Sequence, residues 1–249
     1  MSIFQTALPY DPFAAPPLPG IRPLGDLPWL LRDEAHAAQM AERERLLREK
    51  RDAVIAMDEA ARPAAEELLE TVLADQFPGA TTEAIRADGV TVPIDRADPM
   101  GTLNCLVQED LCLMEKRGEE HVLTAAALCF PARWMLSEKF LRPLIRIHRP
   151  VDVYDDGIAK RVQRLFDGVQ PGRPIWRFNR VDHADPALHQ PVSEYARHDH
   201  PGPDRAKPYL RSERQCILRL PRTRAVVFSI HTYVLDITAD APAEGGTSG

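Results

Sequence analysis

The stretch "ERQCILRLPRTRAVVFSIHTYVLDI", residues 213–237, decides the fold class of this chain. It holds two runs of apolar and β-branched residues, the composition that is typical of β-strands, and only the short segment "RTR" divides them. Two long strands joined by a short turn predict an antiparallel pair at this end of the sequence.

Other runs of the same character indicate that this pair belongs to a larger sheet. The segments "LNCLVQEDLCLMEK" (103–116) and "EEHVLTAAALCF" (119–130) are separated by Arg117 and Gly118, which favours a second antiparallel hairpin. Two further strands are predicted at 89–94 and 174–181.

Helical segments lie before and between these strands. Residues 33–50 and 61–77 are rich in alanine, glutamate and leucine and predict two N-terminal helices. In the middle, 131–148 is compatible with a helix broken by Pro143, and 155–169 places its apolar residues on one helical face. This order predicts an α+β fold: a PAS-like antiparallel sheet with central helices over one face, plus N-terminal helices and an extended arm. A small molecule or a flat cofactor would then be held between the sheet and the central helices.

The composition divides the chain into three parts. Residues 1–28 hold seven of the 23 prolines and predict an extended proline-rich arm, because proline interrupts both helix and sheet hydrogen bonding. The small polar residues of 238–249 predict a flexible tail. The remainder, 29–237, is expected to form a single domain that includes the N-terminal helices.

Charge, hydropathy and cysteine usage exclude several classes of function. The net charge is −6, from 37 acidic and 31 basic residues, so we expect no nucleic-acid partner. No apolar run approaches the roughly 18 residues of a spanning helix, and the first residues lack a secretory leader pattern, so we expect no membrane and a cytoplasmic protein. The four cysteines form no CxxC pair, which favours reduced core thiols over a disulfide framework or a zinc site.

A histidine, His148, ends the apolar segment "LRPLIRIH" and is flanked by Arg146 and Arg149. An axial haem ligand needs an imidazole presented from an apolar wall, and the haem propionates need cationic partners such as arginine. The same residues also fit a helix end with solvated arginines, because Pro150 stops the helix. From the residues alone both interpretations stay open.

Several other side chains have two interpretations each. Glu109 in "VQEDLCLM" is either an acid at a strand edge or a pocket carboxylate. Arg211 and Arg214 form either a polar strand face or an anion-binding group, and His231 in "FSIHTY" is either a hydrogen-bonded core residue or a ligand. The sequence has no dinucleotide-binding, P-loop, nucleophile-elbow or HExxH motif, so redox chemistry would use a borrowed cofactor.

A set of short motifs makes the chain similar to a known family. The pieces, in chain order, are "GIRPLGDLPWLLRDEAH" (20–36), "CFPARW" (129–134), "RPL" (142–144), "IHRPV" (147–151), "LRSERQ" (210–215) and "RLP" (219–221). Together they resemble the haem-dependent oxidative N-demethylase alpha subunits, from about residue 19 to residue 237.

The resemblance implies a function with several parts. Residues 29–237 would form a single PAS-like haem-binding domain that holds haem b, with His148 as the iron ligand and Arg146, Arg149, Arg211 and Arg214 as the cofactor-binding residues. The domain would use O2 to oxidise a small methylated amine, which leaves its methyl group as formaldehyde. Glu109 is expected to be the catalytic carboxylate that orients this substrate. Electrons would come from NAD(P)H through the flavin and iron–sulfur centre of a partner reductase or ferredoxin subunit.

Two positions depart from the family pattern. The family usually reads "RxNW" where this chain has "RFNR", ending in Arg180, and it tends to read "IRTY" where this chain has "IHTY", with His231. Two alternatives to the enzyme therefore remain: a haem or small-ligand PAS sensor without turnover, and a subunit that docks a partner and has lost its cofactor.

Overall fold

The C-terminal hairpin forms the centre of the large sheet. In the computed structural model, which describes residues 2–14, 20–148, 156–196 and 206–238, β8 (Tyr209–Arg219) pairs antiparallel with β9 (Val226–Asp236). The pairing is continuous from Tyr209 opposite Asp236 to Arg219 opposite Val226. The predicted hairpin is therefore confirmed, and β8 begins four residues before the run that predicted it.

Seven strands of the described residues join in this sheet, in the order β1-β7-β8-β9-β5-β6-β2, and every neighbouring pair is antiparallel. Besides β8 and β9 the strands are β1 (Arg22–Pro23), β2 (Ile55–Met57), β5 (Asp110–Arg117), β6 (Glu120–Ala127) and β7 (Ile175–His183). A separate small hairpin consists of β3 (Glu83–Ile85) and β4 (Thr91–Pro93). The fold is thus mixed α/β with an antiparallel sheet.

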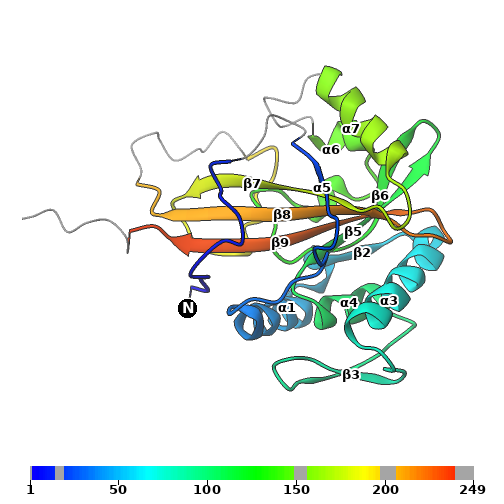
Figure 1. Cartoon of the computed structure of the whole chain (residues 1–249), viewed down its shortest axis with the longest axis horizontal. Helices are drawn as coiled ribbons and strands as arrows, with labels where there is room; N and C mark the ends of the chain where they lie inside the picture. The colour runs from blue at the N-terminus through cyan, green and yellow to red at the C-terminus, as the bar shows by residue number, and fades with distance from the viewer. Residues whose placement is uncertain (1, 15–19, 149–155, 197–205, 239–249) are drawn as a thin grey trace, which may run out of the picture.

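Helices cover both faces of this sheet (Figure 1). On one side lie α1 (His36–Glu49), α3 (Arg62–Gln76) and α4 (Pro99–Leu106); on the other lie α5 (Leu136–Lys139), α6 (Leu144–His148) and α7 (Asp156–Gly168). A short helix α2 (Arg51–Val54) and a 3-10 turn (Glu59–Ala61) connect α1 to α3. The two N-terminal helices and the central helices over one face are as predicted, whereas the helical layer on the second face was not foreseen.

Two hydrophobic clusters hold the layers together. Leu68 and Leu103, from α3 and α4, pack with Leu111 and Val227 of the sheet. On the opposite face, α6 and α7 contribute Leu144 and Phe166 to a cluster with Cys112 and Ile217. Leu111 and Cys112 are neighbours on β5 and join different clusters because successive side chains of a strand point to opposite faces.

One predicted strand was wrong over its first seven residues, 103–109. Residues 103–106 belong to α4, and β5 begins only at Asp110. The helix starts where the Asp98 side chain accepts a hydrogen bond from the Gly101 backbone N–H, with Pro99 in the first turn. The apolar run "LNCL" fits a buried helix as well as a strand, so its composition alone did not identify it.

The described part of the N-terminal arm contacts the sheet rather than projecting from it. Its β1 pairs with β7, and the backbone N–H of Gln5 donates to the carbonyl of Val234 in β9 at 2.9 Å. In Figure 1 the dark-blue N-terminal segment crosses the strands β8 and β9. No helix among the described residues is long and apolar enough to cross a membrane.

Candidate functional site

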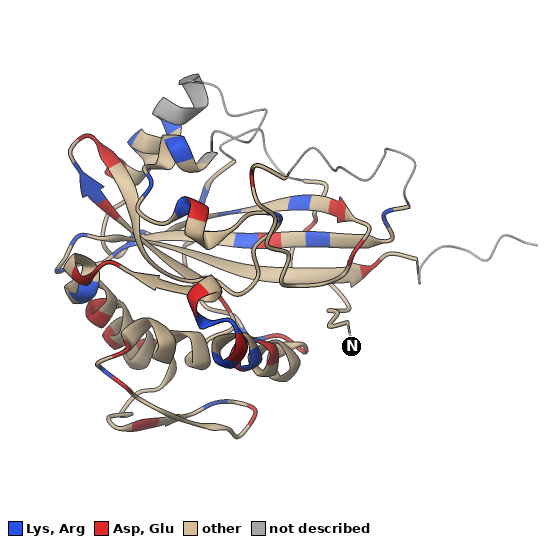
Figure 2. Ribbon diagram, turned by 180° about the vertical axis from the view of Figure 1, so that it is seen from behind, with Lys and Arg blue, Asp and Glu red and all other residues tan. Residues whose placement is uncertain are grey.

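Alternate residues of β7, β8 and β9 build two different surfaces on the sheet. One is the α6 face, whose apolar row Ile175, Ile217 and Phe228 packs in the same cluster as α6 and α7. The other is the arm face, on which Phe178, Arg214 and His231 lie opposite one another. Charged residues fall within the strands themselves as well as on the helices (Figure 2). Both faces of the sheet therefore carry residues that could form a binding site.

On the α6 face the side chains change from apolar to polar along the strands. Beyond the row of Ile175, Ile217 and Phe228, the register brings these residues together: Arg177 and Asn179 of β7, Gln215, Glu213 and Arg211 of β8, and Thr232 of β9. Three of their buried polar atoms have no hydrogen-bond partner, namely Arg177 Nε, Arg211 Nε and Thr232 Oγ1. Buried polar atoms are nearly always bonded, so this cluster is a place where a polar ligand would find donors.

Glu213 supplies the negative charge of this polar cluster. The residue is 7% exposed, and its Oε2 accepts hydrogen bonds from Asn179 Nδ2 and Gln215 Nε2, both at 3.0 Å. Its Oε1 lies 3.7 Å from Arg211 Nη2. Burial lowers the pKa of the Arg177 guanidinium, against the opposing effect of Glu213. The α6 face thus offers one oriented carboxylate and an arginine with spare hydrogen-bond donors.

The predicted iron ligand lies at the C-terminal end of α6, on this side of the sheet. His148 is the last residue of the helix, and Leu144 and Ile147 pack against the sheet through the shared cluster. Arg146 forms an ion pair with Glu194, which also contacts Lys139. Arg149 lies outside the described residues, as does the segment up to 155. The assignment of His148 and its flanking arginines stays a prediction.

The two predicted arginines of β8 point to opposite faces, because their sequence separation is odd. Arg211, on the α6 face, is 2% exposed and donates to the carbonyls of Leu188 at 3.0 Å and Phe130 at 2.5 Å. Arg214, on the arm face, donates to the carbonyl of Pro28 at 2.7 Å. The structure therefore does not bring the two guanidinium groups together, and their anion-binding role stays a prediction.

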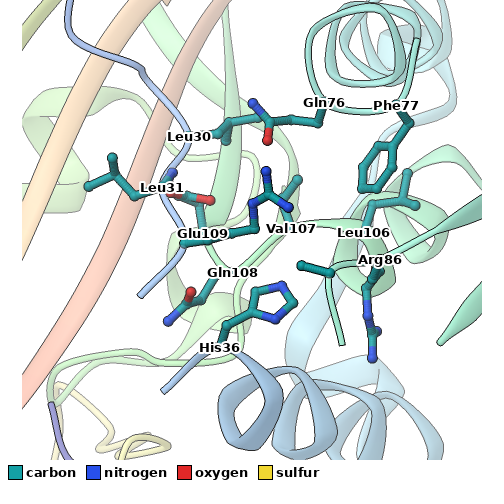
Figure 3. Close-up of a pocket in the computed structure, with 12 residues that line it drawn as sticks. Leu30, Leu31, His36, Gln76, Phe77, Arg86, Leu106, Val107, Gln108 and Glu109 are labelled. Carbon is teal, nitrogen blue, oxygen red and sulfur yellow. Dashed lines mark hydrogen bonds between the residues drawn. The ribbon is translucent and has the colours of Figure 1, made fainter. Parts of the chain in front are cut away.

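Glu109 lies on the side of the N-terminal helices and the arm, away from α6. Its Oε1 accepts hydrogen bonds from the Leu31 backbone N–H at 2.6 Å and lies 2.9 Å from His231 Nδ1. Its buried Oε2 has no partner. Figure 3 shows Glu109 beside Leu31 and Gln108 at a cavity of about 10 Å³. That volume has room for about one water molecule, so the catalytic role of Glu109 also stays a prediction.

His231 is a hydrogen-bonded core residue, which confirms one of its two interpretations, and it lies at the centre of a buried charge cluster with Asp33 and Glu109. Its Nε2 lies 3.0 Å from Asp33 Oδ2, opposite the contact of Nδ1 with Glu109. Burial disfavours the imidazolium, but the hydrogen bonds to Asp33 and Glu109 outweigh it and raise the pKa of His231 to about 9. Burial raises the pKa of Asp33, but the hydrogen bonds from His231 and Gln108 lower it more. The pKa of Asp33 falls to about 2 as a result. Both ring nitrogens of the doubly protonated ring are used, so His231 acts as a structural cation.

The sequence carries a local pattern that is consistent with the polar cluster. Arg177 and Asn179 stand in "RFNR", and Glu213 stands between the two arginines of "LRSERQ". Arg177 and Asn179 are two residues apart, as are Arg211 and Glu213. On a strand this spacing puts both members of each pair on the same face. Within the described residues, no group of three or more His, Cys, Asp or Glu side chains is placed so that it could hold a metal ion.

A comparison with protein families adds an independent finding. The model of the family described as "Haem-dependent oxidative N-demethylase, alpha subunit-like" matches residues 20–247, which is nearly the whole chain. The match includes α6 and all three strands of the polar cluster.

Proposed function

Because the chain belongs to the haem-dependent oxidative N-demethylase, alpha subunit-like family, we propose that it binds haem on the α6 face and demethylates a small methylated amine. The sheet and the helices α5 to α7 would then form a PAS-like pocket. The observation that carries this proposal is the cluster of unpartnered polar atoms on the same face as α6.

The residues of the α6 face fit the chemistry of a haem. Its apolar row would contact the flat ring, and arginine is suited to the carboxylates of the propionates. Arg177 has an Nε without a partner and Arg211 has another, so both have donors available for a carboxylate. His148 of α6 would hold the iron, and Arg146 and Arg149 flank it in the sequence.

Bound haem would supply the activation of O2 for oxidation of a carbon next to nitrogen. In the balanced reaction one oxygen atom of O2 is inserted into a C–H bond of the N-methyl group, and the C–N bond then breaks to give formaldehyde and the demethylated amine. The second oxygen atom leaves as water, which takes up two protons and two electrons. We propose that these electrons come from NAD(P)H through a separate reductase or ferredoxin subunit with flavin and an iron–sulfur centre.

The chain's own contribution would be to bind and orient the amine. An ammonium group that enters a partly apolar pocket must be paired with an anion or lose its proton. Glu213 is the carboxylate of the polar cluster, and its Oε2 is already oriented by Asn179 and Gln215. We therefore propose Glu213 as the substrate partner on the α6 face. Glu109 remains the alternative from the sequence, on the other side of the sheet.

A formaldehyde assay tests the proposal. The full chain, supplemented with haem, is incubated with dimethylamine, trimethylamine and N-methylated amino acids, with either hydrogen peroxide or a ferredoxin reductase system and NADPH. We expect formaldehyde in proportion to haem content, and none without an electron source or peroxide. A Glu213→Gln variant should lose turnover while keeping haem, and a Glu109→Gln variant provides the matched comparison.

Each negative result has a defined meaning. Haem-loaded protein that binds CO reversibly but makes no formaldehyde from any of these amines would overturn the demethylase and favour a sensor. Protein that remains colourless after haem supplementation would overturn haem binding itself and favour a subunit that has lost its cofactor.

A further inference from the structure

The arm face contains a cavity of about 410 Å³ that the proposed haem chemistry does not use. It lies between the N-terminal arm and the strands β7 and β8, with Tyr10, Trp176 and Phe178 in its wall. The rings of Tyr10 and Phe178 are stacked with their centroids 4.3 Å apart. Its volume is within the usual range for small-molecule sites, and its wall offers flat aromatic surface.

A buried cation sits in this aromatic wall. Arg214 lines the cavity at 4% exposed, and its guanidinium carbon lies 5.2 Å from the ring centroid of Trp176. Its hydrogen bonds go to the backbone carbonyls of Pro28 and Trp29, which are neutral acceptors. Among the described residues, no carboxylate lies within ion-pair distance of Arg214. Buried charges are normally paired, so the cavity adjoins a cation that is suited to an anionic ligand.

The other charges around the cavity favour the same sign of ligand. Arg22 also lines it, with its guanidinium carbon 5.9 Å from the ring centroid of Phe178. Asp11 is the one acidic residue among the described lining residues. The two carboxylates nearby on the arm side, Asp33 and Glu109, are bonded to His231. The described lining therefore carries one more positive than negative charge.

Aromatic walls of this kind often bind methylated ammonium groups, but the two arginines argue against that occupant here. Guanidinium groups already lie near the rings of Trp176 and Phe178, and they would repel a second cation. The cavity is thus distinct in both place and charge from a site for the amine.

We propose that the arm-face cavity binds a planar aromatic carboxylate. The aromatic part of the ligand contacts the apolar wall that Tyr10, Trp176 and Phe178 form, and its carboxylate pairs with Arg214 and Arg22. The inference does not depend on haem, because the cavity and the α6 face lie on opposite sides of the sheet.

Calorimetric titration of the full chain without added haem tests this site. The probes are 2-naphthoate, its neutral amide 2-naphthamide and the cation 2-naphthylmethylammonium. We expect 2-naphthoate to bind with a stoichiometry of one, the amide to bind at least about tenfold more weakly, and the cation not to bind, because only the carboxylate forms charge-assisted hydrogen bonds.

Variants locate the binding. Arg214→Gln and Trp176→Leu should each weaken 2-naphthoate binding at least about tenfold, and Arg22→Gln, an exposed change that leaves the core intact, should weaken it several-fold. Arg48→Gln, an exposed arginine on α1, is the matched control and should leave the Kd unchanged. Equal affinity for the three probes, or an unchanged Kd in Arg22→Gln and Trp176→Leu, would overturn the proposal. So would displacement of 2-naphthoate by one equivalent of haem, since the cavity would then belong to the cofactor.

Discussion

His231 of β9 and Glu109, the residue before β5, form a buried pair with 2.9 Å between Nδ1 and Oε1, although they lie 122 positions apart in the sequence. Asp33, between the arm and α1, lies on the other side of the imidazolium, with its Oδ2 3.0 Å from Nε2. This cluster fastens the segment that precedes α1 to the middle of the sheet. Its stability depends on pH through the charge of His231.

We expect the free energy of unfolding to fall between about pH 6.5 and pH 9. Folded His231 keeps its proton up to about pH 9, whereas the unfolded residue loses it near its ordinary pKa of 6.5. The stabilisation is therefore fully present below pH 6.5 and lost by pH 9, and it amounts to about 3 kcal/mol from 1.4 kcal/mol per pKa unit. Asp33 contributes in the acid range, where its stabilisation is lost as the pH falls from about 3.8 to about 2. Urea unfolding at a series of pH values measures both.

His231→Gln supplies the control for that profile. The variant should be less stable at pH 6 by about 3 kcal/mol or more, because it leaves two carboxylates beside a neutral side chain. Its stability should not decrease between pH 6.5 and pH 9 as that of the wild type does. Parallel pH profiles for the two proteins would show that another group carries the dependence.

The ion pair of Arg43 and Asp110 is expected to be essential for stability. Both side chains are fully buried, and Arg43 Nη1 lies 2.6 Å from Asp110 Oδ1. Asp110 also accepts hydrogen bonds from the backbone N–H groups of Cys129 and Phe130. Asp110→Asn should lower the free energy of unfolding by about 3–5 kcal/mol, since Arg43 then remains buried without its partner charge. Glu49→Gln, which removes the exposed partner of Arg45, should have no measurable effect on thermal unfolding. Similar losses in both variants would contradict the argument from burial.

Haem retention distinguishes two histidines. We expect His148→Ala to lose most of its haem, because no other imidazole ends α6. His189→Asn is the informative comparison: Nδ1 of His189 contacts the Cys129 carbonyl at 2.8 Å, and its buried Nε2 has no partner. That geometry is also compatible with a ligand. The Soret absorbance per chain after desalting measures haem retention in both variants. Loss of haem in His189→Asn but not in His148→Ala would assign His189 as the iron ligand.

Arg177 and Arg211 should respond differently to substitution by methionine. Arg177→Met should reduce haem retention about tenfold or more and leave the stability of the haem-free chain unchanged or slightly higher, because burial already disfavours this charge. Arg211→Met should lower the free energy of unfolding by about 1–3 kcal/mol, since the carbonyls of Phe130 and Leu188 lose their donor. Haem retention and the free energy of unfolding of the haem-free chain, measured for both variants, test this difference. A haem-free Arg177→Met protein that is as destabilised as Arg211→Met would assign Arg177 a structural role.

Sequence patterns predicted the elements whose signal is local. The hairpin of β5 and β6 follows from two short apolar segments on either side of Arg117 and Gly118, and α3 follows from its helix-forming residues after Pro63. The two- and three-residue strands β1 and β2 were missed, because they are strands only through pairing with β7 and β6. Short segments of this kind carry no periodicity of their own.

The candidate site was predictable only in part for a similar reason. Motifs singled out Arg211 and Arg214 together, but the register of β8 places them on opposite faces. Glu213, between them in the sequence, has significance only when Asn179 and Gln215 are seen to orient it. Contacts between residues as distant as Asp33 and His231 depend on the assembled sheet.

The contact of Gln5 with Val234 bears on how copies of the chain avoid association. Beyond Ile230, β9 has no pairing with β5, and there Gln5 supplies both an N–H to the Val234 carbonyl and a side-chain acceptor to its N–H. These partners are 229 positions apart in the sequence, so the arm can cover this edge only once β9 has taken its place in the sheet. While the arm is undocked, the edge of β9 is open to pairing with another chain. Docking of the arm thus protects the folded sheet against edge-to-edge association.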